Sequence, residues 1–216
     1  MSQPQTNTTS DPHDRIVWID CEMTGLDPRQ HTLVEIAVHI TDAQLNVLDD
    51  GLDLVIHATD SQLAAMDDYV TQMHASSGLT EEIKASSITI KEAEQQVLNH
   101  IRSFVAEPRT APLAGNSIAS DRAFLKEYMP ELDAFLHYRM LDVSTLKELS
   151  RRWYPEVYSH QPEKGMSHRA LADIKESIRE LVYYRQAMML PAESITKESV
   201  RQAADEASTL VPISHS

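Results

Sequence analysis

The chain has 216 residues, and 33 acidic against 19 basic side chains give it a formal charge of −14 at pH 7. This length predicts one domain of the usual size, about 100–200 residues, with a core that needs no disulfides or structural metal ions. The acidity argues against proteins that hold long nucleic acid or an anionic membrane surface, because such proteins contact phosphates through Lys and Arg.

The cysteine content and the N-terminal segment indicate the cellular setting. Cys21 is the one cysteine, which excludes an internal disulfide and a zinc site built from cysteines. The first fifteen residues are polar, and the longest apolar runs, such as 16–19, have four residues, whereas a membrane span needs about 20. We therefore expect no membrane contact and a cytoplasmic location.

The N-terminal third predicts a tail and three strands. Residues 1–13 are polar and aperiodic, which is typical of a mobile tail. Residues 15–22, RIVWIDCE, are apolar on both faces, as in a buried strand. Residues 33–40 alternate, and residues 51–57 follow a turn-forming segment. The apolar side of the second strand carries Val34, Ile36, Val38 and Ile40. Three closely spaced strands predict an antiparallel meander.

The rest of the chain predicts helices that alternate with two short strands. Thr89 and Glu92 form a capping-box pattern at the start of a helix that ends before Pro108. Residues 112–116 and 139–142 are predicted as short strands. Further helices are predicted around Phe124, Leu125 and Tyr128, up to about Trp153, from Leu171 to Arg185, and in the exposed segment after Pro191.

These elements predict the fold class. A meander followed by alternating strands and helices favours an α/β domain with a mixed β-sheet flanked by helices. We expect this single domain to occupy residues 14–190, with 191–216 as a C-terminal helix and tail.

Asp20 and Glu22 end the first predicted strand. Residues two apart in a strand point to the same face, so two carboxylates project side by side from an apolar segment. Burial of unpaired carboxylates is costly, and a divalent cation would compensate for it. The plainer interpretation is a strand that runs out into solvent, and the short Asp-x-Glu pattern alone favours that one.

Asp121 lies in the first turn of its predicted helix. Phe124 and Leu125 are three and four residues further on, so Asp121 shares their inward stripe. A first-turn acid is also favoured by the helix dipole alone, without any function. The sequence leaves both interpretations open.

His168 and Asp173 flank the start of the last long helix. They would lie about 140° apart if both were helical, so they converge only if His168 precedes the helix, for example with Ser167 as N-cap. A histidine near a cap is more often a surface residue. Combined with the other three acids, however, the pair suits two-metal phosphoryl chemistry, in which acids hold the ions and a neutral histidine deprotonates water.

Four strings occur in order between about Arg15 and Met189: IVWIDCEMTGLD, GNSIASDRAFL, YRMLDVSTLKEL and HRALADIKESI. They resemble the motifs of the bacterial oligoribonucleases, members of the DEDDh family of 3′–5′ exonucleases with a ribonuclease-H-like fold. The resemblance implies a hydrolase, a two-metal-ion exoribonuclease that degrades very short single-stranded RNA, down to dinucleotides, to nucleoside 5′-monophosphates.

The resemblance also implies roles for the five reactive residues. Asp20, Glu22, Asp121 and Asp173 match the four metal-holding acids, and His168 matches the general base. Two divalent cations, Mg²⁺ or Mn²⁺, are implied. Asp20 would bridge both ions, Glu22 and Asp173 would complete the site of the ion that activates water, and Asp121 would serve the second ion.

Other positions match residues near the substrate in the same family. Leu26 matches an apolar wedge between the two bases, and His74, Ser117 and Ser144 match groups near the phosphates. Tyr69 stands in a segment where many members carry a tryptophan, and a tyrosine can still stack on a base with a smaller face.

The resemblance further implies a homodimer. Tyr138 and Arg139 match a pair that reaches the active site of the other subunit. Asp142 has two interpretations from the sequence, support of the site or a cap on the next helix, and the cap is favoured.

Two alternative functions use the same sequence features. An exonuclease that trims DNA would need the same five residues, because contacts to a 2′-hydroxyl are not visible in a sequence. A non-catalytic protein that binds metal and a partner would keep the fold.

The charge of −14 argues against long nucleic acid only, since one or two phosphates need few basic contacts when bound cations supply positive charge.

Overall fold

The computed structural model describes residues 14–165 and 168–213. The predicted tail over 1–13 and the predicted Ser167 cap lie outside the described residues. Five strands form one mixed sheet in the order β3-β2-β1-β4-β5. The strands are β1 (Arg15–Met23), β2 (Leu33–Asp42), β3 (Leu52–Val55), β4 (Pro112–Gly115) and β5 (His137–Asp142). The first three form the predicted antiparallel meander, and β4 and β5 continue the sheet parallel to β1.

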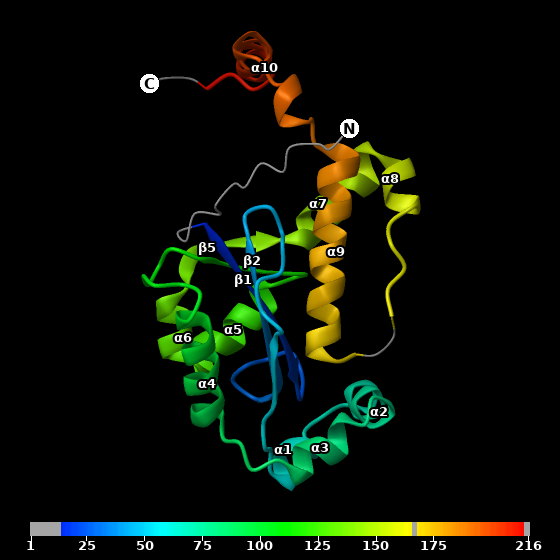
Figure 1. The fold of residues 1–216 in the computed structure, drawn as a ribbon. Coiled ribbons are helices and arrows are strands. Elements are labelled where there is room, and N and C mark those ends of the chain that lie inside the picture. The colour runs from blue at the N-terminus through cyan, green and yellow to red at the C-terminus, as the bar shows by residue number, and fades with distance from the viewer. Residues whose placement is uncertain (1–13, 166–167, 214–216) are drawn as a thin grey trace, which may run out of the picture.

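Helices cover both faces of this sheet (Figure 1). One face is covered by α4 (Ile90–Arg102), α5 (Ala119–Tyr128) and α6 (Pro130–Phe135). The other is covered by α7 (Val143–Trp153) and α9 (Ala170–Met188), with α8 (Pro155–Ser159) between them in the chain. The predicted mixed sheet flanked by helices is therefore confirmed.

Three helices that the sequence did not predict form a small lobe: α1 (Asp60–Leu63), α2 (Asp68–Ser76) and α3 (Leu79–Ala85). This lobe lies beside the start of α9 (Figure 1). It packs on the sheet through Val34 of β2, which contacts a cluster containing Leu79 and Ile83 of α3. The predicted apolar stripe of β2 is thus divided, because Ile36, Val38 and Ile40 belong to the main core.

The two faces of β1 have different environments. Val17, Ile19 and Cys21 point into the core under α4, α5 and α6. Trp18 packs on the α9 side, and strand alternation puts Asp20 and Glu22 on that side as well. The end of β1 thus turns two carboxylates toward α9.

The helix ends agree with the sequence in most places. Thr89 and Glu92 form the predicted capping box, with the Glu92 amide donating to Thr89 Oγ1 at 3.2 Å and the Thr89 amide to Glu92 Oε2 at 2.9 Å. The N-cap of α9 is Arg169, which makes no side-chain capping bond.

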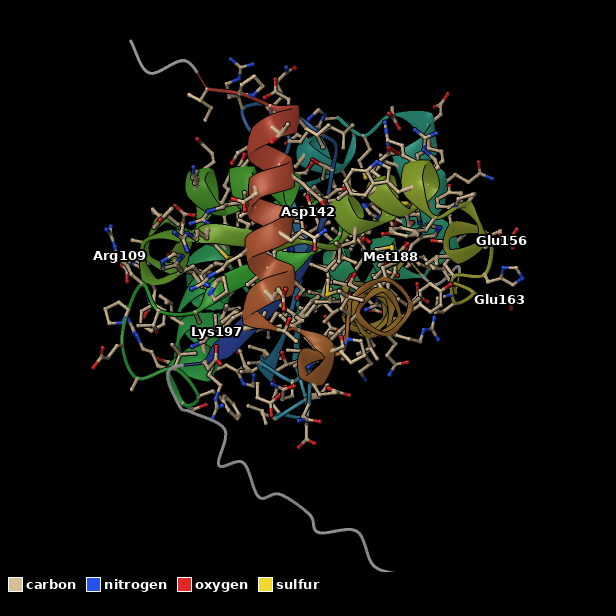
Figure 2. The ribbon with its side chains drawn as sticks, turned by 90° about the horizontal axis from the view of Figure 1, so that it is seen from above. Arg109, Asp142, Glu156, Glu163, Met188 and Lys197 are labelled. Atoms are coloured by element: carbon tan, nitrogen blue, oxygen red, sulfur yellow. The ribbon has the colours of Figure 1, made fainter. Side chains whose placement is uncertain are left out.

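The C-terminal segment lies apart from the sheet. After the short 3-10 helix η1 (Ala192–Ser194), α10 (Lys197–Leu210) exposes all of its residues, as expected for solvated surface. Figure 2 shows Lys197 at the start of α10 and Met188 at the end of α9. Within the described part of the chain, no helix is long and apolar enough to cross a membrane.

Asp49 joins three segments by one buried carboxylate. It accepts hydrogen bonds from His39 Nδ1 at 2.9 Å, His100 Nε2 at 2.6 Å and the Ile40 amide at 3.0 Å. Burial raises the pKa of Asp49, but the hydrogen bonds from His39, Ile40 and His100 outweigh burial and leave that pKa below its ordinary value. The carboxylate therefore stabilises the fold in its charged form.

We expect Asp49→Ala to lower the free energy of unfolding by about 3 kcal/mol, because buried donors lose their acceptor. Asp50→Ala, at the exposed neighbouring residue, should change it by less than about 0.5 kcal/mol. A carboxyl group with a lowered folded-state pKa stabilises above its unfolded pKa, near 4, and loses that contribution as pH falls through the folded value. Urea unfolding should show a constant difference from about pH 5 to 7 that shrinks in stronger acid.

Candidate active site

Three carboxylates meet where β1 ends against α9. Asp20 and Glu22 come from β1, and Asp173 comes from the first turn of α9. One oxygen from each lies within 4.8 Å of the others. The packing of α9 on the sheet thus brings together residues about 150 positions apart in the chain, as the predicted metal site requires.

Asp121 approaches the same strand from α5. It is buried in the first turn of that helix, and its Oδ1 accepts a hydrogen bond from the amide of Cys21 at 3.0 Å. Cys21 lies between Asp20 and Glu22 in β1. Phe124 and Leu125 are buried with Asp121, so its predicted inward orientation is confirmed.

Burial and mutual repulsion make this acidic cluster unfavourable without a cation. Burial raises the pKa of Asp20 well above its usual value, and the charges of Asp121, Asp173 and Glu22 raise it further. Burial together with Glu35 and other acids raises the pKa of Glu22 to about 8, and burial raises that of Asp121 to about 7. Hard carboxylate oxygens at this density fit a divalent cation, which would neutralise them.

His168 directly precedes α9, with a left-handed φ of 45°, whereas Asp173 is helical. This is the arrangement that allows the two side chains to converge, as the sequence predicted. Burial raises the pKa of Asp173, and the nearby charge of Glu176 raises it further, whereas the proximity of His168 lowers it by less.

His74 lies behind Glu22. Its side chain is fully buried in the last turn of α2, with Nε2 at 2.9 Å from the Met23 carbonyl oxygen and Nδ1 at 3.9 Å from Glu22 Oε2. In this structure His74 therefore contacts the acidic cluster through Glu22 rather than presenting a free surface.

Ser117 and Ser144 lie together at the ends of β4 and β5. The Ser117 amide donates to Asp142 Oδ1 and to Ser144 Oγ, each at 3.0 Å. Asp142 also accepts from the Ser144 amide at 3.0 Å, which confirms it as the N-cap of α7. The same carboxylate orients Ser117, so Asp142 serves the cap and this serine pair.

The remaining predicted residues are solvent-exposed. Leu26 follows β1 and Tyr69 lies on α2, with exposed fractions of 87% and 71%. Tyr138 and Arg139 project from β5, the edge strand, with Arg139 Nε donating to the Tyr138 hydroxyl at 3.1 Å. Because β4 separates β5 from β1, the fold does not bring this pair to the acidic cluster of its own chain.

Sequence reasoning missed two residues next to this cluster. Glu35 is fully buried in β2, opposite Glu22 in the strand pairing, and Arg169 binds it at 2.8 Å. A charged residue within the apolar string LVEIAVHI was the available signal, because buried charges are rare unless paired.

Comparisons with known proteins show the family of this chain. A family model described as Exonuclease matches residues 17–181. The oligoribonuclease of Corynebacterium glutamicum (strain R) is 58% identical over 214 residues, which cover 98% of this chain and 96% of that protein. The oligoribonuclease of Nocardia farcinica (strain IFM 10152) is 59% identical over 190 residues, 88% of each chain.

Solved structures share the fold at low identity. Exonuclease I from Methylocaldum szegediense matches with a TM-score of 0.59 and 17% sequence identity. The zinc-bound complex of E. coli exonuclease I with single-stranded DNA matches with a TM-score of 0.61 and 12% sequence identity. Each match covers 81% of this chain, which spans 41% of the other. The architecture is thus ribonuclease-H-like, and the family match together with the three clustered carboxylates supports the use of a divalent metal ion. The chain belongs to the oligoribonuclease family and is a 3′–5′ exoribonuclease.

Proposed function

We propose that this chain hydrolyses very short single-stranded RNA, down to dinucleotides, and releases nucleoside 5′-monophosphates from the 3′ end. The observation that supports this most directly is the group of Asp20, Glu22 and Asp173, whose oxygens lie within 4.8 Å of one another beside the turn that carries His168. Together with Asp121, this set has the parts for hydrolysis of a phosphodiester.

The four acids would hold two divalent cations, Mg²⁺ or Mn²⁺. When bound, such ions lower the pKa of water and stabilise charge on the phosphate and on the departing oxygen. His168 accepts the proton of the attacking water. The new bond joins the water oxygen to phosphorus, the bond to the 3′ oxygen of the preceding nucleotide breaks, and that oxygen leaves with a proton from solvent.

We infer that the substrate-binding groups flank the acidic cluster. Leu26 and Tyr69 offer exposed apolar and aromatic surface for two bases. Ser117 and Ser144 offer hydroxyl groups for phosphate oxygens, and His74 supports Glu22 from behind. Few basic groups are needed, because a dinucleotide carries one internucleotide phosphate.

An RNA length series tests this function. Chains of two to about seven nucleotides should show the highest rate at the short end, with matched DNA dinucleotides slower. A rate that rises with length would exclude a site built for chain ends, and equal rates on DNA would favour the DNA-trimming alternative. Divalent-cation binding without any turnover would favour a non-catalytic role.

We also infer that residues 14–190 form the catalytic domain, that the protein acts in the cytoplasm, and that two copies form a homodimer. Exposed Tyr138 and Arg139 on an edge strand support the dimer, because a pair remote from its own acidic cluster can reach a second one across a two-fold axis.

Mixing two inactive variants should restore activity if Tyr138 completes the partner's site. Asp20→Asn damages the acids and Tyr138→Ala the donated group, so each homodimer has two damaged sites. A mixed dimer has one intact site, and random re-association should return about a quarter of the wild-type rate. Arg109→Ala, at an exposed residue, should leave the rate unchanged when introduced alone. A mixture that stays inactive while mixed dimers form would contradict this exchange.

A further inference from the structure

Arg169 joins three parts of the fold that are distant in sequence. Its Nε donates to Glu35 Oε1 in β2 at 2.8 Å, and its Nη1 and Nη2 donate to the two oxygens of Glu82 in α3 at 3.0 and 2.7 Å. The contact with Glu82 is the two-pronged geometry that a guanidinium allows and an ammonium does not. We call these three residues the Arg169 bridge.

The Glu35 arm of the bridge fixes the start of α9. The second oxygen of Glu35 accepts the amide hydrogen of Ala170, the first residue of α9, at 3.2 Å. A carboxylate at this end of a helix satisfies a free backbone donor and interacts well with the helix dipole. Since Glu35 is fully buried, its charge depends on Arg169 as a partner.

The Glu82 arm ties the lobe of α1, α2 and α3 to the same point. The lobe carries Tyr69 and His74 on α2, which contacts α3 directly. Besides this arm, α3 is attached to the sheet by apolar packing of Leu79 and Ile83 around Val34 and, at its C-cap, by the hydrogen bond from Ser86 Oγ to the Val55 carbonyl oxygen at 2.6 Å. The Ser86 bond ties the end of α3 to β3, whereas the paired hydrogen bonds of Arg169 tie the helix to the start of α9 and so set the orientation of the lobe relative to α9.

His168 is the residue that this bridge holds. It directly precedes Arg169 and has a φ of 45°, a conformation that residues other than glycine rarely adopt and that the surroundings must maintain. With Arg169 fixed by two carboxylates and Ala170 by Glu35, the backbone that follows His168 has little freedom.

We propose that Arg169 and Glu82 are positioning residues. They fix the position of the general base, His168, relative to the lobe that carries Tyr69. Stacking at Tyr69 then places the scissile phosphate where His168 can accept the proton of the attacking water. This inference rests on the proposed function, and it adds that Glu82, which lies on the lobe, controls the turnover step.

Glu82→Gln is the sharpest test, because it removes the charge at a half-exposed side chain and leaves buried Glu35 paired with Arg169. On a diribonucleotide, kcat should fall about tenfold with a much smaller change in KM, since small misplacement of a reacting group is costly in rate. Glu81→Gln is the matched control: Glu81 is the preceding residue of α3 and pairs with Lys84 on the exposed surface. It should leave both constants unchanged, and the melting temperatures of both variants should stay close to that of the wild type.

Two further variants separate positioning from simple support of the fold. Arg169→Lys keeps the charge but lacks the planar fork that binds both oxygens of Glu82 while Nε contacts Glu35, so kcat should again fall while the protein stays folded. Tyr69→Ala combined with Glu82→Gln should cost less than the product of the single effects, because fixing the lobe matters only when a base is stacked on it.

The outcomes distinguish this inference from the function on which it rests. If the wild-type protein did not hydrolyse diribonucleotides, the proposed function itself would be wrong. An active wild type with equal kcat for Glu82→Gln and Glu81→Gln, or an unchanged Arg169→Lys, would overturn the positioning role. If the effects of Tyr69→Ala and Glu82→Gln on kcat multiplied fully, the position of the lobe would not be coupled to the action of His168.

Discussion

Asp20→Asn should reduce diribonucleotide hydrolysis by about a thousandfold or more, while the protein free of metal becomes no less stable. The rate falls because Asp20 is one of the three carboxylates whose oxygens lie within 4.8 Å of one another, and metal ions held there would contribute several kcal/mol of transition-state stabilisation, each ~1.4 kcal/mol being a factor of ten. Stability is kept because the change removes a buried carboxylate surrounded by like charges.

The measurement pairs single-turnover rates with thermal unfolding in chelator and in Mg²⁺ or Mn²⁺. The wild type should gain melting temperature as the cation binds, since a ligand at a hundred times its Kd adds about 2.7 kcal/mol, and Asp20→Asn should lose most of that gain. Asp205→Asn, on exposed α10, is the matched control and should behave as wild type. If Asp20→Asn lost its activity but kept the full metal-induced gain in melting temperature, Asp20 would not be a metal ligand.

Local patterns predicted β1, which carries two of these acids, and α4, which covers one face of the sheet. The apolar string of β1 and the capping box of α4 are each encoded within a few residues, and the structure confirms both. Alternation along β1 was enough to place Asp20 and Glu22 on one face, and helical spacing was enough to turn Asp121 inward. These features depend on neighbours in the chain, which a sequence displays directly.

Other features depend on pairs that only the folded chain brings together. Arg169 meets Glu35 across 134 residues and Glu82 across 87, and His74 meets the Met23 carbonyl across 51. The lobe of α1, α2 and α3 consists of short helices with weak amphipathic patterns, so it escaped prediction. A buried Glu35 could be suspected from its apolar neighbours, but no local signal names its partner.

His168→Ala should give the second large loss, with a different signature from Asp20→Asn. A positioned general base contributes about a hundredfold to ten-thousandfold, so kcat on a diribonucleotide should fall within that range. His168 precedes α9 and does not belong to the group of three carboxylates that could hold a metal ion. The gain in melting temperature on adding Mg²⁺ or Mn²⁺ should therefore remain in this variant.

His160→Ala provides the matched control for this experiment. His160 is an exposed histidine at the end of α8, and its partners are local: the Glu156 carbonyl oxygen and the Ser159 hydroxyl. Its removal should change neither kcat nor the metal response, because the side chain lies on the outer surface. If His168→Ala lost the metal-induced gain as fully as Asp20→Asn, His168 would belong to the metal site. If instead its rate matched that of His160→Ala, another group would be the base.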